Sequence, residues 1–184
     1  DVLEISRRIR RGAGSTYRRI ADDLAGWLSR AEADAPGLLR IDPDFAYPDY
    51  IRAQDIHLQP GSYQDDALAG FVFHYGSKVF FTGANDDDRL HNAMAAWAPI
   101  EGSPERIVDF GCGIGQSTTA FKERFPEAEV HGVDIGAPMV RYAHARAREL
   151  GIEVHFSQQN AAHTDFADGS VDAVLAMILF HELP

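Results

Sequence analysis

The sequence has almost no cysteine, and this excludes several classes of protein. Cys112 is the single cysteine among 184 residues. A disulfide framework within the chain is therefore impossible, and so are a cysteine-rich metal site and an iron–sulfur cluster held by three cysteines. No pair among His57, His74 and His91 has clear metal-ligand spacing. We therefore expect no metal site.

Long apolar runs and an excess of positive charge are also lacking. No stretch approaches the roughly 20 apolar residues that a membrane span requires, and no signal peptide is visible. Seventeen basic residues stand against 28 acidic ones, which gives a formal net charge of -11. Such a balance disfavours a general role on nucleic acid or on a membrane surface. We expect a soluble, cytoplasmic protein.

Positive charge is concentrated near the start of the chain. The first nineteen residues hold six arginines: Arg7, Arg8, Arg10, Arg11, Arg18 and Arg19. One interpretation is a solvated helix face with a flexible loop around Gly12 and Gly14; the other is a docking patch for an acidic partner or for phosphate. From Ser15 onwards the apolar spacing predicts a helix, which Ser15 and Thr16 can cap.

The segment FVFHYGSKVFF, from Phe71 to Phe81, is a dense aromatic run. Its period does not distinguish a strand pair that turns at Gly76 from a buried helix. We assign residues 1–100 to a mostly helical, aromatic-rich N-terminal extension that serves as a substrate cap or in dimerisation.

The pattern changes from Ile107 onwards. RIVDF, AEVHGVD, IEVHF and VDAVLAMI read as strands, and helical segments separate the first three. Strands that alternate with helices indicate an α/β fold with a parallel sheet and right-handed crossovers. We therefore assign residues 101–184 to one half of a ligand-binding α/β domain.

The stretch IVDFGCGIGQST joins the first of these strands to a helix. It places Asp109 just before three glycines, Gly111, Gly113 and Gly115. Glycines in such a turn allow a ligand to approach the backbone. Asp134 ends the next strand, where an acid can accept hydrogen bonds from both hydroxyls of a ribose.

Two classes of cofactor use this arrangement. A dinucleotide motif needs a small sixth residue, but that position is Gln116 or Thr118, depending on the first glycine chosen. Asp109 would also repel a pyrophosphate. A ligand with a cationic amino acid end reverses that sign, which favours S-adenosylmethionine.

Three motifs resemble the class I S-adenosylmethionine-dependent methyltransferases. VDFGCGIGQST resembles the first motif of that family, an acid followed by G-x-G-x-G. VHGVDIGAPMVRYA resembles its second strand with the acidic end. SQQNAAHTDFADGSVDAVLAMILFHEL resembles the stretch with the adenine contact and the fourth strand. The resemblance covers about residues 104–184 and implies a Rossmann-like methyltransferase core that methylates a small molecule.

The resemblance also implies roles for single residues. Asp109 and the backbone of Gly111 and Gly113 would hold the methionine end of the cofactor, with Met177 near it. Simple core packing is the alternative role for Met177.

At the adenosine end, Asp134 would take the ribose hydroxyls and Ile135 would pack on the adenine, unless Ile135 is plain core. Asn160 stands where the family usually has Asp, and it would bond the adenine edge together with the backbone N–H of Ala161. Either side chain at position 160 has the needed acceptor.

The family places acceptor-side residues just after the fourth strand, where His181 and Glu182 stand. Methyl transfer needs a general base only when the acceptor has a proton to lose. His181 is then the candidate base, because imidazole titrates near neutrality; its alternative role is packing at the strand exit. The aromatic residues Tyr63, Phe73, Tyr75 and Phe80 either line an apolar acceptor pocket or form core.

Two other functions stay open: an NAD(P)-dependent oxidoreductase and a non-catalytic, methyltransferase-like binding subunit. The resembling family has a seven-stranded sheet, whereas we identify four strands before Pro184. An apolar strand left as an open edge is an aggregation hazard. We expect the core to be truncated after its fourth strand, and either a longer polypeptide or a second chain, as in a homodimer, to complete the sheet.

Overall fold

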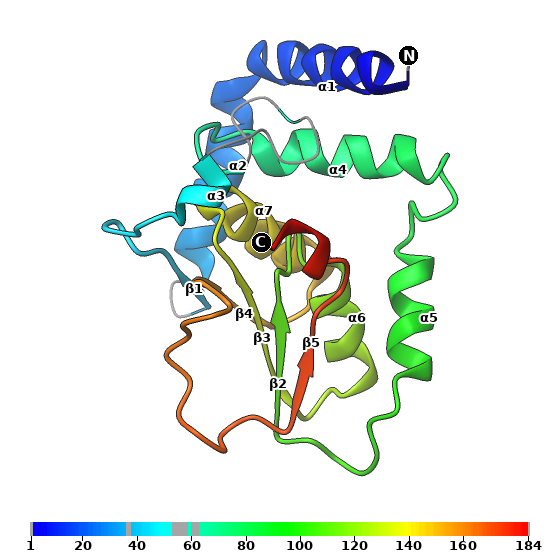
Figure 1. The fold of residues 1–184 in the computed structure, drawn as a ribbon, viewed down its shortest axis with the longest axis vertical. Helices are drawn as coiled ribbons and strands as arrows, with labels where there is room; N and C mark the ends of the chain where they lie inside the picture. The colour runs from blue at the N-terminus through cyan, green and yellow to red at the C-terminus, as the bar shows by residue number, and fades with distance from the viewer. Residues whose placement is uncertain (1, 36–37, 53–58, 60–62, 184) are drawn as a thin grey trace.

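The computed structural model describes residues 2–35, 38–52, 59 and 63–183. A parallel sheet lies at one end of the molecule, and a layer of helices from the N-terminal region crosses the carboxyl ends of its strands (Figure 1). His57, one of the histidines considered above as a metal ligand, lies outside the described residues.

The helices and strands follow one another in a simple order. The helices are α1 Val2–Arg18, α2 Ala21–Asp34, α3 Asp49–Arg52, α4 Ala69–Phe80, α5 Arg89–Trp97, α6 Gln116–Arg124 and α7 Ala137–Leu150, with the short 3-10 helix η2 Phe180–Glu182. The strands are β1 Leu39–Arg40, β2 Arg106–Phe110, β3 Glu129–Asp134, β4 His155–Gln158 and β5 Ala173–Leu175.

All described strand pairs in the sheet are parallel, in the order β1-β4-β3-β2-β5. The predicted parallel α/β core is therefore confirmed, and its first and fourth strands, β2 and β5, are neighbours. The structure adds β1, which the sequence analysis missed because two residues carry no detectable alternation. It also corrects the third strand, which begins at His155 rather than at Ile152, and shortens the fourth to three residues.

The central strands are apolar on both faces. Ile107, Val108, Val130 and Val133 are essentially inaccessible to solvent, as expected for strands of a parallel sheet. The two crossovers β2-α6-β3 and β3-α7-β4 advance across the sheet in the same direction. Right-handed crossovers then place α6 and α7 on one face of the sheet, where both contact β3.

The N-terminal helices differ from the prediction. The expected loop around Gly12 and Gly14 is wrong, because both glycines lie inside α1. Thr16 does not cap a helix start; its hydroxyl donates to the carbonyl of Gly12, 3.0 Å away. Packing offsets the low helix propensity of the two glycines, because Ala13 is buried and α1 packs along α4 (Figure 1). Among the described residues, no helix is both long and apolar enough to cross a membrane.

The aromatic run that the sequence left undecided is the helix α4. Its start, Ala69 to Val72, is buried, and Phe71 belongs to a cluster with one aromatic residue each from α1, α2 and α7. The ring centroids within this cluster lie 4.7–5.7 Å apart; its members are Tyr17, Trp27, Phe71 and Tyr142. Aromatic burial of this size ties the N-terminal helices to α7.

Polar contacts reinforce the same junction. Arg141 on α7 donates two hydrogen bonds to the carboxylate of Glu32 on α2, at 2.7 and 3.0 Å. The Nε2 atom of His144 lies 3.0 Å from the carbonyl oxygen of Ala31. Because α7 also packs on the sheet, the helical layer and the sheet form one packed body.

This junction predicts opposite effects for two glycine-to-alanine changes. A Cβ atom at Gly70 would lie 2.3 Å from Cβ of Tyr142, whereas a Cβ atom at Gly12 would meet nothing within 4 Å. We expect Gly70→Ala to lower the free energy of unfolding by roughly 1–3 kcal/mol through overpacking. Gly12→Ala should raise it by about 0.5–1 kcal/mol, because alanine restricts the unfolded helix segment. Urea unfolding measures both, and a neutral Gly70→Ala would contradict the tight contact.

Candidate functional site

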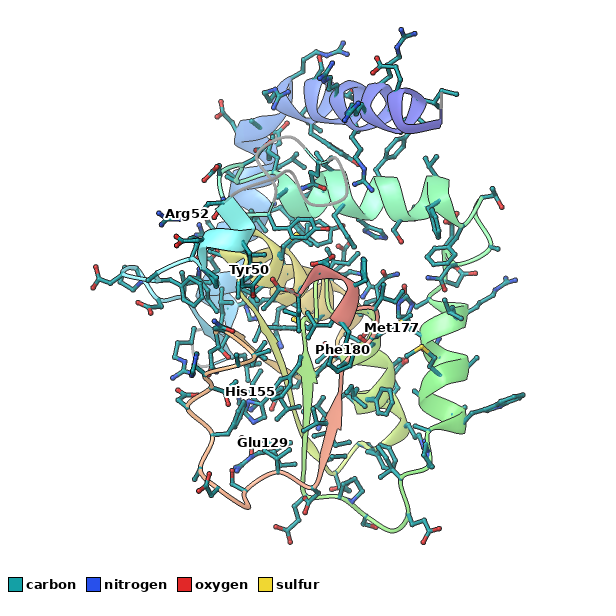
Figure 2. The ribbon with its side chains drawn as sticks, in the orientation of Figure 1. Tyr50, Arg52, Glu129, His155, Met177 and Phe180 are labelled. Carbon is teal, nitrogen blue, oxygen red and sulfur yellow. The ribbon has the colours of Figure 1, made fainter. Side chains whose placement is uncertain are left out.

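A cavity of about 290 Å³ lies where the sheet meets the helical layer. The glycine loop after β2, the end of β3, η2 and one side of α4 all contribute to its wall. Tyr50 and Met177, both in the wall, lie near the carboxyl ends of the strands in Figure 2, whereas Glu129 and His155 lie toward the opposite end. Ligands of open parallel sheets bind at this carboxyl end.

The glycine loop presents an open surface to the cavity at one position. Gly113 has a φ of +54°, and a Cβ atom built there would find only Cε of Met139, 3.9 Å away. At Gly111 the same atom would collide with Leu179, and at Gly115 with Phe156. Gly111 and Gly115 therefore allow close packing of the protein on itself, and Gly113 leaves room for a ligand beside the backbone.

Asp109 lies beneath this loop and is fully buried. One carboxylate oxygen, Oδ2, accepts hydrogen bonds from the hydroxyls of Ser117 (2.6 Å) and Thr118 (2.8 Å) at the start of α6. Oδ1 has no hydrogen-bond partner among the described residues. Burial raises the pKa of Asp109 to about 6, against the lowering effect of the two hydroxyls. Asp109 is not in the cavity wall, whereas Ser117 is.

Asp134 is in the wall and joins two loops. Its Oδ2 accepts from the backbone N–H of Gly113 at 2.9 Å, and its Oδ1 accepts from that of Gly136 at 2.8 Å. Each carboxylate oxygen keeps acceptor capacity for a further donor. Burial, and then to a smaller extent the charges of Glu182 and Asp109, raises the pKa of Asp134 to about 6, although the two N–H groups lower it.

The structure brings the remaining predicted cofactor residues to the same cavity. Ile135, Asn160, Ala161 and Met177 all contribute to the wall. The side chain of Asn160 bends back on its own loop, where Oδ1 accepts from the backbone N–H of Ala162 at 2.9 Å. Its amide NH₂ group keeps its donor capacity.

The segment after β5 turns sharply over the strand ends. Ile178 has a φ of +55°, which is strained for a β-branched residue. As a result Leu179 packs on Gly111, and η2 places Glu182 in the cavity wall. His181 is not among the wall residues, and its side chain is 47% exposed. The structure thus brings Glu182, rather than the predicted His181, to the cavity.

Of the four aromatic residues predicted to line an acceptor pocket, Tyr63, Phe73 and Phe80 do contribute to the wall, and Tyr75 does not. Tyr75 is 45% exposed. The pKa of the Tyr63 hydroxyl is raised well above its usual value, first by burial and then by the nearby charge of Glu182. Tyr63 is therefore a neutral group between the aromatic wall and the acids.

A buried polar network supports the start of α6. Asp88 accepts hydrogen bonds from Gln116 and from Arg146 on α7. His91 lies in the wall beside this network, and its Nδ1 is 3.1 Å from the amide nitrogen of Asn85. Leu90 donates its N–H to the amide oxygen of Asn85, so the amide nitrogen faces the ring. Burial lowers the pKa of His91, and the neutral ring then carries its proton on Nε2.

Within the described residues, no three His, Cys, Asp or Glu side chains are grouped so that they could hold a metal ion. Cys112 is buried in the glycine loop, and burial raises the pKa of its thiol. It packs as a small side chain facing Gly132.

Arg10 and Gln116 are among the wall residues with functional groups that the sequence analysis missed. Arg10 was grouped with the surface arginines of α1, and Gln116 was considered only as a poor fit to the dinucleotide motif. No local signal separates Arg10 from its neighbours, because its environment comes from α4, far along the chain. Gln116 had a usable signal, because it begins the helix that follows the glycine loop.

Several known proteins are similar in sequence to part of this chain. Residues 107–184 match a family described as a methyltransferase domain. A demethylmenaquinone methyltransferase from Thermus thermophilus is 41% identical over 75 residues, which cover 41% of this chain and 34% of that protein. A trans-aconitate 2-methyltransferase from Rhodopseudomonas palustris is 37% identical over 101 residues, which cover 54% of this chain and 37% of that protein.

A similar fold occurs in the magnesium protoporphyrin IX methyltransferase from Synechocystis. The TM-score is 0.52 at 18% identity, over 77% of this chain and 67% of that chain. This likeness supports the fold alone. The chain spans about a third of the length of the two relatives above.

The buried carboxylate of Asp109 predicts a pH-dependent stability. Its pKa rises from 3.8 in the unfolded chain to about 6 in the folded state. The folded state therefore binds more protons between about pH 4 and pH 6, and this group lowers the free energy of unfolding as pH rises through that window, by roughly 3 kcal/mol. Asp109→Asn should remove this fall in stability, because an amide does not titrate in this range. Its oxygen can still accept hydrogen bonds from the hydroxyls of Ser117 and Thr118.

Urea unfolding of both proteins from pH 4 to pH 8 measures the difference. Asp168→Asn, which changes an exposed carboxylate, is the matched control and should follow the wild-type curve. A difference between Asp109→Asn and wild type that does not change with pH would contradict the buried charge.

Proposed function

Because residues 107–184 form a methyltransferase domain of the class I S-adenosylmethionine-dependent type, we propose that the protein transfers a methyl group from S-adenosylmethionine to a small-molecule acceptor in the cavity. One observation carries the proposal. The open face of Gly113 and the carboxylate of Asp134 are joined by a 2.9 Å hydrogen bond and both face that cavity.

The residues present fit this cofactor. Asp134 offers its oxygens to the two ribose hydroxyls, beside Ile135 as an apolar surface for the adenine. Asn160 and the backbone N–H of Ala161 would bond the adenine edge. At the other end, Met177 and the backbone of Gly111 and Gly113 would surround the methionine portion.

Asp109 acts on the cofactor from beneath the loop. Its carboxylate places a negative charge under the end of the cavity where a cationic ammonium would lie, and the same charge disfavours a pyrophosphate. We propose that Asp109 both orders the start of α6 and selects the charge of the ligand.

The bound cofactor supplies a methyl group that is already activated. The residues of the chain then have to orient the acceptor and exclude water. The aromatic wall formed by Phe73, Phe80 and Phe81 provides an apolar surface for this purpose. When the acceptor has a proton to lose, we propose Glu182 as the base, because it is in the wall; the role predicted for His181 has not been tested.

The two relatives named above are methyltransferases whose names refer to small molecules, demethylmenaquinone and trans-aconitate. They support a small-molecule acceptor and leave the acceptor atom open. An NAD(P)-dependent oxidoreductase and a binding subunit without catalysis remain as outcomes of the experiments below.

The cofactor assignment predicts a loss of binding when Asp134 is removed. Asp134→Ala should weaken binding of S-adenosylhomocysteine by roughly 2–4 kcal/mol, because two charge-assisted hydrogen bonds are lost. Gly113→Val should abolish binding by filling the open space. Calorimetry measures both, with Asp168→Ala as the control and NAD as the competing ligand. Unchanged affinity for S-adenosylhomocysteine in Asp134→Ala would reject the assignment, and binding of NAD instead would favour the oxidoreductase.

The base assignment predicts different effects for two neighbouring residues. With an acceptor that loses a proton, found in a panel of small phenols and amines, Glu182→Gln should lower the single-turnover rate by roughly 10²–10⁴-fold. His181→Ala should change it far less, because that side chain is outside the wall. The reverse order of effects would return the role to His181. Cofactor binding without turnover of any acceptor would favour the non-catalytic subunit.

A further inference from the structure

Arg10 differs from the other arginines of α1 because it lies in the cavity wall. Arg7, Arg8 and Arg11 are exposed. The guanidinium of Arg10 rests on the backbone of Gly76 in α4, so that a Cβ atom there would lie 3.0 Å from Nη1 and 3.2 Å from Cζ. A glycine inside a helix is unfavourable by roughly 0.5–1 kcal/mol relative to alanine. At this position it lets the guanidinium reach the cavity.

The guanidinium has a neutral partner. Nη1 of Arg10 donates to Oε1 of Gln59 at 3.3 Å, and Nε2 of Gln59 donates to the carbonyl of Ala69 at 3.2 Å. Gln59 is buried, so it orients the guanidinium without offsetting its charge. Among the described residues, no carboxylate lies within ion-pair distance of Arg10.

Three other partly buried arginines contact carboxylates, whereas Arg124 donates to the backbone carbonyls of Ala95, Ala98 and Ile100. Arg106 contacts Glu129, Arg141 contacts Glu32, and Arg146 contacts Asp88. Burial lowers the pKa of Arg10, with a smaller opposing effect from Tyr63. A partly buried guanidinium whose N–H donors have no anionic acceptor raises the free energy of the folded state. An anion that accepts from these donors would remove this cost. The cavity is the side from which such an anion can come.

The wall carries charges of both signs. Among its described residues, Arg10 is the one arginine or lysine, and Asp134 and Glu182 are the carboxylic acids. Tyr63 is also in the wall, and after burial the charges of Glu182, Arg10 and Asp134 all act on the pKa of its hydroxyl. The other titratable residues of the wall, among those described, are Tyr50, His91 and Cys112. Burial lowers the pKa of His91. An anionic end of a ligand would therefore be repelled from the acids and drawn to Arg10.

We propose that Arg10 binds an oxyanion of the methyl acceptor, a carboxylate or a phosphate, and thereby orients the acceptor with its opposite end toward the glycine loop. This specificity role rests on the proposed methyl transfer. Gln59 is a positioning residue, and the aromatic side chains Phe73, Phe80 and Phe81 hold the apolar part of the acceptor between the two ends.

Three probes with the same apolar part test this proposal: 3-phenylpropionate, 3-phenylpropyl phosphate and neutral 3-phenylpropan-1-ol. Each is titrated by calorimetry into the full chain, with and without saturating S-adenosylhomocysteine. We expect at least one anion to bind roughly tenfold tighter than the alcohol, because a charge-assisted pair forms in a partly enclosed site. Comparison of the two anions tells carboxylate from phosphate.

Arg10→Gln should remove most of this preference, by weakening binding of the anion far more than binding of the alcohol. Arg10→Lys should keep part of it, and Arg11→Gln, an exposed arginine on the same helix, should keep all of it. No preference for either anion in the wild type, or the same preference in Arg10→Gln, would overturn the proposal. Failure to bind S-adenosylhomocysteine would count against the proposed methyl transfer instead, and the titrations without it would still decide whether Arg10 holds an oxyanion.

Discussion

The packing of α7 is the constraint on which the rest of the structure depends. This helix is buried almost all round: Met139, Tyr142 and Ala145 join the cluster with the N-terminal helices, while Val140, Ala143 and Ala147 join the sheet core. A helix that is apolar on opposite faces has to lie between two layers. Because α7 links those layers, the N-terminal helices are held over the carboxyl ends of the strands, and the cavity is enclosed.

Enclosure has electrostatic consequences. Asp109 and Asp134 both have pKa values raised by burial, and both are held by donors at or beside the glycine loop. The hydrogen bonds from these donors stabilise the two carboxylates close to the cavity, although burial removes water from them. The positive φ of Ile178, a residue of the cavity wall, adds backbone strain at this site. A cationic ligand with hydrogen-bond donors would offset the desolvation of these carboxylates.

The part of the site that follows local rules could be predicted from the sequence. A strand, a glycine turn and a helix occur in consecutive residues, so the positions of Gly113 and Asp134 follow from the parallel sheet itself. The part that depends on distant segments could not. His181 and Glu182 are adjacent, and only the turn at Ile178 decides which of them faces the cavity. The strand β1 was missed because two residues pair with β4 through contacts across the chain.

The sequence by itself determined the α/β core with its parallel strands and the acid-and-glycine loop, because hydrophobic period and turn chemistry act over a few residues. It left the aromatic segment of α4 undecided and misplaced the break near Gly12. Only the tertiary structure decided these, because burial of Ala13 and Phe71 against other helices outweighs the weak local preferences. A tertiary contact also decides that the side chain of Arg10 reaches the cavity, because Gly76 on α4 provides the space for its guanidinium.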